Sequence, residues 1–125
     1  MMEKITLLLP EQFLQENAAI PLSPHSFYRE FSRPENVAAM QKLLSNYHYE
    51  DKAEVTDCEI VEDRIRINTD GSGTVYVKYR LHYFLACSGI NYDEKDNMTI
   101  TFQCNWPMKT VQICSAARLE RSDEL

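Results

Sequence analysis

The feature that most constrains the fold is a long alternation of residue types over residues 74–87. Every odd position there is apolar or aromatic, and the even positions are mostly polar or mixed; the odd set is Val75, Val77, Tyr79, Leu81, Tyr83, Leu85 and Cys87. A helix would spread these positions around its whole circumference, so the alternation predicts a long β-strand with one buried face. Strands of parallel sheets are buried on both faces and lose the alternation, so we expect this strand to lie centrally in an antiparallel sheet.

A preceding strand is predicted over residues 53–68, joined to the first by a tight turn at residues 69–73 whose glycines allow positive φ. Its apolar residues change phase from even positions to odd ones, which predicts a β-bulge near residues 60–63. Placing Ile67 opposite Val75 and Ile65 opposite Val77 brings two apolar faces together.

Two more strands are predicted after a polar loop at residues 88–95. The first buries Met98, Ile100, Phe102 and Cys104, and the last buries Val111, Ile113 and Leu119. A turn at residues 105–108 places Cys104 opposite Lys109 and Phe102 opposite Val111. The four strands, taken in order, form a meander.

The helices are expected to come before the sheet. Residues 32–48 form the main helix, with Ser32 and Glu35 as a capping box and one apolar stripe, made of Val37, Met40, Leu43, Leu44 and Tyr47. Residues 1–31 form a flank with two short helices, which begin at Pro10 and after Ser23. We therefore predict one α+β domain over residues 1–125, with N-terminal helices packed on one face of a four-stranded antiparallel meander (residues 53–119) and a tail at residues 120–125.

This order of elements over residues 32–119 resembles the cystatin-like and NTF2-like superfamilies, in which a curved sheet wraps a helix. The resemblance is one of element order, without a residue motif. It implies a fold and transfers no site residue.

Composition limits the classes of function. The formal net charge of −6 argues against general nucleic-acid coating. The four cysteines, Cys58, Cys87, Cys104 and Cys114, form no C-x-x-C pair, so free thiols in a reducing compartment are expected, with disulfides as the alternative. The three histidines have no ligand spacing, and we predict neither a metal site nor a cofactor.

No stretch reaches the roughly 20 apolar residues of a membrane span, and the apolar run before Pro10 is too short for a signal peptide. The final residues 122–125 resemble an ER-retention signal, which we treat as coincidence. The expected location is cytoplasmic.

The exposed sheet face is the leading candidate site. It is predicted to be basic with aromatic edges, and it comprises Arg64, Arg66, Tyr76, Lys78, Arg80, His82, Phe84 and Arg118. Arg64 would lie opposite Lys78, an unfavourable pairing of like charges. We predict a small non-enzymatic interaction module, of the inhibitor, immunity or adaptor type, that binds an acidic protein surface or a second copy of itself; single-stranded nucleic acid is the less favoured ligand. The alternative for these residues is a solvated face balanced by Glu62 and nearby acids.

A second hypothesis places a pocket between helix and sheet, lined by Asp63, Tyr79, Tyr83, Tyr47 and Tyr28. The NTF2-like resemblance implies a small-molecule-binding protein or an isomerase-type enzyme, in which a carboxylate base acts with tyrosine donors in such a pocket. Asp63 falls on the buried phase of its predicted strand. The alternative here is a set of core tyrosines with an aspartate at a bulge.

Overall fold

The computed structural model describes residues 3–18, 22–49, 52–85 and 90–116, except for the side chains of residues 84, 85, 90 and 91. Within these ranges the chain has an α+β fold. The helices are α1 (Glu11–Glu16), α2 (Pro24–Phe31) and α3 (Pro34–Tyr47), and a short 3-10 helix, η2, spans Glu62–Arg64. The strands are β1 (Lys4–Leu8), β2 (Ala53–Ile60), β3 (Arg66–Ile67), β4 (Ser72–Leu85), β5 (Ile90–Asn105) and β6 (Thr110–Cys114).

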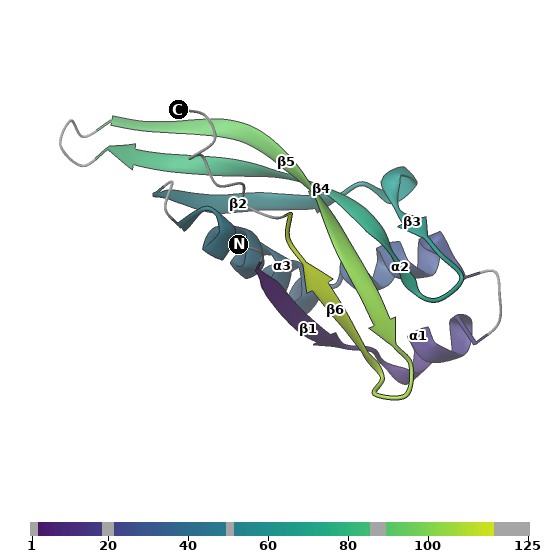
Figure 1. The fold of residues 1–125 in the computed structure, drawn as a ribbon. Coiled ribbons are helices and arrows are strands. Elements are labelled where there is room, and N and C mark those ends of the chain that lie inside the picture. Colours follow the sequence, from purple (N-terminus) through teal and green to yellow (C-terminus); the bar gives the residue numbers. More distant parts are fainter. Residues whose placement is uncertain (1–2, 19–21, 50–51, 86–89, 117–125) are drawn as a thin grey trace, which may run out of the picture.

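The strands form one antiparallel sheet in the order β1-β6-β5-β4-β2, and β3 pairs with β4 (Figure 1). The prediction of an α+β fold with an antiparallel sheet is confirmed. The prediction of four strands is wrong, because β1 adds an edge strand beside β6 and the segment expected as the first strand is divided into β2 and β3.

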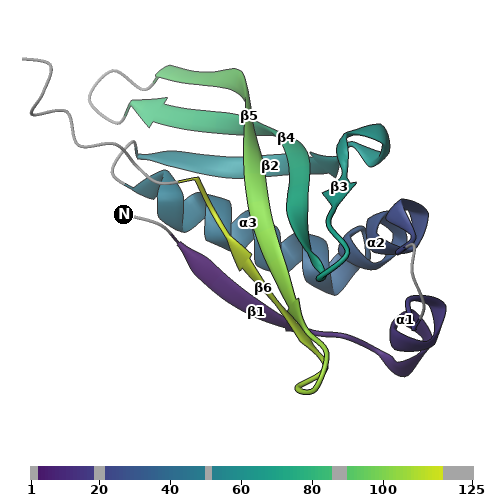
Figure 2. The ribbon, with the colours of Figure 1, turned by 45° about the vertical axis from the view of Figure 1, so that its right-hand side comes forward.

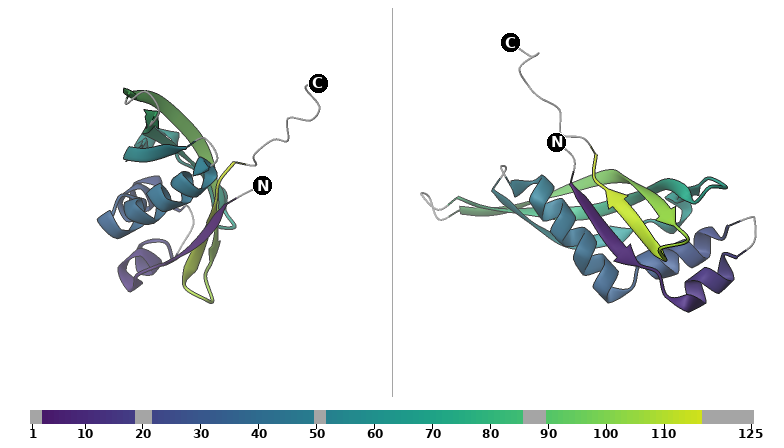
Figure 3. Two further views of the ribbon diagram at one scale, coloured as in Figure 1. Left: turned by 90° about the vertical axis from the view of Figure 1, so that its left-hand side faces the viewer. Right: turned by 60° about the horizontal axis from the view of Figure 1, so that its bottom comes forward.

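The sheet curls around α3 (Figures 2 and 3), and α3 contacts β2 and β1, the two strands at the ends of the sheet order. All three helices lie on the concave side of the sheet (Figure 3). The concave side holds the core, in which the rings of Phe27 and Phe31 on α2 lie 5.4 and 5.3 Å from the ring of Phe102 on β5. The convex face of the sheet carries no helix in the described part of the chain.

The alternation in β4 predicts its buried face correctly. Val75, Val77, Tyr79 and Leu81 are buried. Tyr83 is half-buried, whereas Cys87 and the side chain of Leu85 lie outside the described residues. A Cβ atom on Gly73 would lie 2.0 Å from the carbonyl oxygen of Arg66, so a glycine is needed there for the close approach of β3.

The predicted bulge exists, but in a different place. The register of β2 against β4 shifts between Thr56 and Glu59, where Asp57 has φ 55°. The chain then leaves the sheet at η2, so Ile67 lies opposite Gly73 and not opposite Val75. The predicted Arg64–Lys78 pairing is also wrong, because Glu59 occupies the position opposite Lys78.

Three predictions about β5 and β6 are corrected. Strand β5 begins at Ile90, so residues 90–95 belong to a strand and not to a loop. Phe102 lies opposite Ile113, two residues from the predicted partner, and a shift of two keeps the same face buried. The turn begins one residue later than expected, with Lys109 N donating to Trp106 O at 3.1 Å and Pro107 in the second position that proline favours. Arg118 and Leu119, assigned to the last strand, lie outside the described residues.

The helix starts are partly as predicted. Ser23 caps α2, and its Oγ accepts from Ser26 N at 3.1 Å. The capping box at Ser32 is wrong, because Arg33 is the N-cap of α3 and makes no side-chain capping bond. No helix among the described residues is long and apolar enough to cross a membrane.

Candidate functional site

The outer face of β4 and its neighbours carries a shallow groove of about 440 Å³. Residues of strands β2, β4 and β5 line the groove. They are Asp57, Glu59, Tyr76, Lys78, Tyr79, Arg80, Lys95, Asp96 and Asn97. Three residues of the predicted basic face, Tyr76, Lys78 and Arg80, therefore come together here. The sequence analysis missed Lys95 because it assigned this residue to a loop. It missed Asp57 because it predicted the β-bulge at residues 60–63, whereas the bulge lies at Asp57.

The groove is mixed in charge. Arg80 Nη1 lies 3.6 Å from Asp57 Oδ2 and 3.9 Å from Asp93 Oδ2. His82 Nδ1 lies 2.6 Å from Asp93 Oδ1. Carboxylates of β2 and β5 thus offset part of the predicted basic face, as the alternative hypothesis of a balanced face expected.

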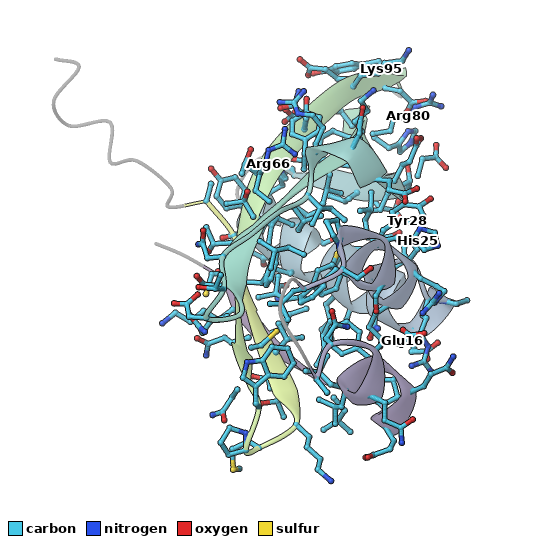
Figure 4. All side chains as sticks on the ribbon, turned by 90° about the vertical axis from the view of Figure 1, so that its right-hand side faces the viewer. Glu16, His25, Tyr28, Arg66, Arg80 and Lys95 are labelled. Carbon is cyan, nitrogen blue, oxygen red and sulfur yellow. The ribbon has the colours of Figure 1, made fainter. Side chains whose placement is uncertain are left out.

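The two lysines of the groove stand apart from these ion pairs. The sheet register places Lys95 opposite Arg80 and Lys78 opposite Asn97. Arg80 and Lys95 lie near each other at one end of the molecule in Figure 4, away from Arg66. Like charges directly opposite each other destabilise a sheet. Among the described residues, no carboxylate oxygen lies within 4.0 Å of the ammonium group of Lys78 or Lys95.

The remaining residues of the predicted basic face have other surroundings. The guanidinium carbon of Arg64 lies 4.4 Å from the centroid of the Tyr76 ring, a cation–π contact at the border of the groove. Arg66 Nη1 donates to the carbonyl oxygens of Asp63 and Ile65 at 2.9 and 3.1 Å, which gives it a structural role. The side chain of Phe84 and all of Arg118 lie outside the described residues.

The predicted pocket does not assemble from its five residues. Asp63 is exposed on η2. The chain leaves the sheet before residue 63, so the strand alternation that was predicted to bury Asp63 does not apply to it. Tyr28 is on α2, with its ring 6.5 Å from that of His25, and Figure 4 shows both side chains on the helical side. The ring of Tyr83 stacks on that of Tyr92 at 4.8 Å.

Only Tyr47 and Tyr79 meet, and they meet at His48. The ring of Tyr47 lies 4.9 Å from the His48 ring, and His48 Nε2 lies 2.8 Å from Tyr79 Oη. His48 is buried, and its Nε2 also lies 3.9 Å from Asp96 Oδ2. The carboxylate beside this cluster is therefore that of Asp96, which is half-buried. Extending the buried phase of Met98 and Ile100 two residues towards the N-terminus would have identified it.

Two further hollows lie elsewhere. One, of about 380 Å³, lies between α1 and α2, and its arginines are already paired, Arg29 with Glu16 and Arg33 with Glu30. The other, of about 740 Å³, is open and lies at the end of α3; its lining residues are Ser45, Asn46, Tyr49, Lys52, Ala53 and Glu54. Because the arginines of the first hollow already pair with carboxylates that line it, we assign no site there.

The described thiols are free, and burial makes two of them harder to ionise. Burial raises the pKa of Cys104 to about 12, and burial together with the charge of Asp57 raises the pKa of Cys58 to about 11. Cys114 is also free, and Cys87 lies outside the described residues. No group of three or more metal-ligating side chains was found among the residues that the structure describes.

Comparison with family models, with curated proteins and with solved structures found no match to this chain. The resemblance to the cystatin-like and NTF2-like superfamilies accordingly stays a prediction.

Proposed function

We propose that this protein is a non-enzymatic interaction module whose outer groove binds acidic side chains of a partner protein. The observation that carries the proposal is the juxtaposition of Arg80 and Lys95 across the sheet, with Lys78 beside them. Like charges that face each other cost stability in the free protein, and in this cluster only Arg80 has carboxylates of described residues within 4.0 Å. Carboxylates of a partner would offset that cost, and charge complementarity would steer the encounter.

The other groove residues give the surface its selectivity. The Tyr76 ring, held under Arg64, offers a flat apolar contact next to the two lysines. Asp57 and Glu59 line the opposite wall and would repel a uniformly acidic ligand. A polypeptide segment with acidic residues set between neutral or basic ones therefore fits better than a polyanion such as nucleic acid.

The test uses a defined acidic probe. Binding of a blocked glutamate–alanine peptide is measured by fluorescence anisotropy at low and high salt, with a lysine–alanine peptide as its counterpart. The variant Lys78→Glu/Lys95→Glu should weaken binding of the acidic peptide by at least about tenfold, which is about 1.4 kcal/mol. The matched control is Lys42→Glu on α3, an exposed lysine that does not line the groove.

Retained affinity in the double variant, or equal loss in Lys42→Glu, would contradict the groove as the binding site. A wild-type protein that binds neither peptide would contradict the proposed function as a whole.

A small-molecule-binding function is the second candidate, and the buried His48 between Tyr79 Oη and Asp96 favours it. In this proposal Asp96 takes the place first assigned to Asp63. A thermal-shift screen of small polar ligands would test it. A ligand whose stabilising effect is lost in Tyr79→Phe and Asp96→Asn, and kept in Asp63→Asn, would support the pocket. The opposite pattern would refute it.

A further inference from the structure

One long edge of β5 stands apart from the rest of the sheet. Strand β6 pairs with residues 101–105 of β5, whereas β4 pairs with β5 from Ile90 to Gln103. Among the described residues, no strand pairs with the other side of residues 90–100. This part of β5 and residues 78–85 of β4 form an arm (Figures 1 and 2). We call the free side of β5 the arm edge.

The hydrogen-bond pattern shows which backbone groups face the arm edge. Cys104 N donates to Gly71 O at 3.0 Å, so even-numbered residues of β5 direct their N–H and C=O groups to β4. Odd-numbered residues direct theirs to the other side, where Thr101, Gln103 and Asn105 meet β6. Farther along the arm, the odd-numbered residues Asp93, Lys95 and Asn97 direct their backbone N–H and C=O groups to the arm edge. The Asn97 N–H already donates to Asp96 Oδ1 at 2.7 Å.

The other two edges of the sheet are protected against strand addition. Both β1 and β2 contact α3, and β2 also has the register shift at Asp57. The arm, by contrast, keeps an unbroken register from Ser72 to Leu85 of β4, and residues 90–100 contain neither proline nor glycine. Ala116 N donates to Met98 Sδ at 3.4 Å, so the described chain reaches this edge at residue 98, and residues 90–97 form the part that no described segment covers. A regular, uncovered edge of this kind is a template for another strand.

Charge decides what kind of strand would fit. Residues 92–97 contain three acids, Asp93, Glu94 and Asp96, and one lysine, Lys95. Glu94 is exposed, and no cationic nitrogen of the described residues lies within 4.0 Å of its carboxylate. Residues 92–97 carry three acids and one lysine, so two copies paired along this edge would bring like charges together, and a second copy of the chain is a poor occupant. A segment with a net positive charge is favoured instead.

We propose that the arm edge binds an extended, net-basic segment of a partner protein as an added antiparallel strand. Backbone hydrogen bonds to Asp93 and Lys95 supply affinity, and the acidic side chains select basic residues at neighbouring positions. This surface is distinct from the outer groove, because it uses the side of the strand and not its face.

The first test separates strand addition from charge attraction. The probe is a blocked eight-residue peptide of alternating lysine and valine. The control is the same peptide with every backbone nitrogen of its residues methylated, which keeps the lysine charges and removes the backbone N–H donors of those residues. The plain peptide should bind at least about tenfold more tightly, the equivalent of two net hydrogen bonds. It should also slow amide exchange at Asp93 and Lys95. Equal binding of the two peptides would overturn the proposal.

The second test acts on the protein. Lys95→Pro removes a donor that faces the arm edge and spares the bonds to β4, whereas Lys95→Ala removes the same charge and keeps the donor. Lys95→Ala should bind the basic peptide at least as tightly as wild type, and Lys95→Pro should bind it at least about tenfold more weakly. Equal affinity of these two variants would refute strand addition. The acidic-peptide experiment tests the groove separately, so the two proposals can fail independently.

Discussion

The two halves of β4 share one alternation but differ in what covers them. In the first half, Val75 and Val77 have exposed fractions of 0%, under the helices. In the arm, Tyr83 is half-buried and stacks on Tyr92, which is 46% exposed. The two-residue side-chain period of the strand thus decides which side chains face inward, while the helices decide whether the inward side is excluded from solvent.

The outer faces of the two halves differ as well. Within the β4–β5 pair, the outer positions of the first half are uncharged: Ser72, Thr74, Thr99, Thr101 and Gln103. On the other side of β4, Arg66 of β3 lies opposite Thr74. On the arm the outer positions include Lys78, Arg80, His82, Asp93 and Lys95. Stability and charge are therefore separated along one strand pair, and both binding surfaces that we propose lie on the half with fewer core contacts.

The largest expected effect contrasts the two ends of β5. Phe102→Ala should lower the free energy of unfolding by about 3–5 kcal/mol, because a buried ring between Phe27 and Phe31 leaves a cavity. Tyr92→Ala on the arm should cost less than about 1 kcal/mol, because its ring is largely exposed. Urea denaturation of both variants measures the difference, and similar losses would erase the contrast between the halves.

The variant Leu81→Ala tests how far the buried core extends along β4. Leu81 is 2% exposed and lies midway along the β4 part of the arm, so its truncation should cost about 2–5 kcal/mol. A loss below about 1 kcal/mol in the same denaturation experiment would mean that the core stops before residue 81.

Charge reversal on the outer face should have a smaller effect on stability. Arg64→Glu with Arg80→Glu removes one cation–π contact and two exposed ion pairs, each worth at most about 1 kcal/mol. We expect a small decrease in melting temperature, which added salt partly removes, together with loss of binding to the acidic peptide. Unchanged peptide binding would exclude these arginines from the site, and a large loss of stability would show that they are structural.

A further effect concerns the buried thiol of Cys104; it is absent at neutral pH and appears only at alkaline pH. Burial raises the pKa of Cys104 to about 12, so the unfolded chain loses this proton first as the pH rises. The stabilising contribution is complete below the ordinary thiol pKa and decreases as the pH approaches the raised value, by up to about 1.4 kcal/mol per pH unit. Urea denaturation between pH 8 and 11 should therefore show a steeper decline for wild type than for Cys104→Ala. Parallel declines would contradict a raised pKa.

Local signals predicted local features. The cap at Ser23, the end of α3 at His48 and the buried face of β4 follow from residues within one turn of helix or one strand. Pairing between strands was less predictable. The positions of the bulge and of the β5–β6 turn each admit several registers with the same buried face, because a shift of two residues leaves the alternation intact.

The candidate site divides in the same way. The sequence by itself determined that Tyr76, Lys78 and Arg80 share one face of one strand, because the side-chain period of a strand is two. Only the tertiary structure decided which neighbours they meet. Asp57, Asp93 and Lys95 come from strands that pair with β4 across long sequence separations. The meeting of His48 with Asp96, and the length of the arm beyond β6, likewise depend on how the sheet curls around α3, and no local pattern encodes that curvature.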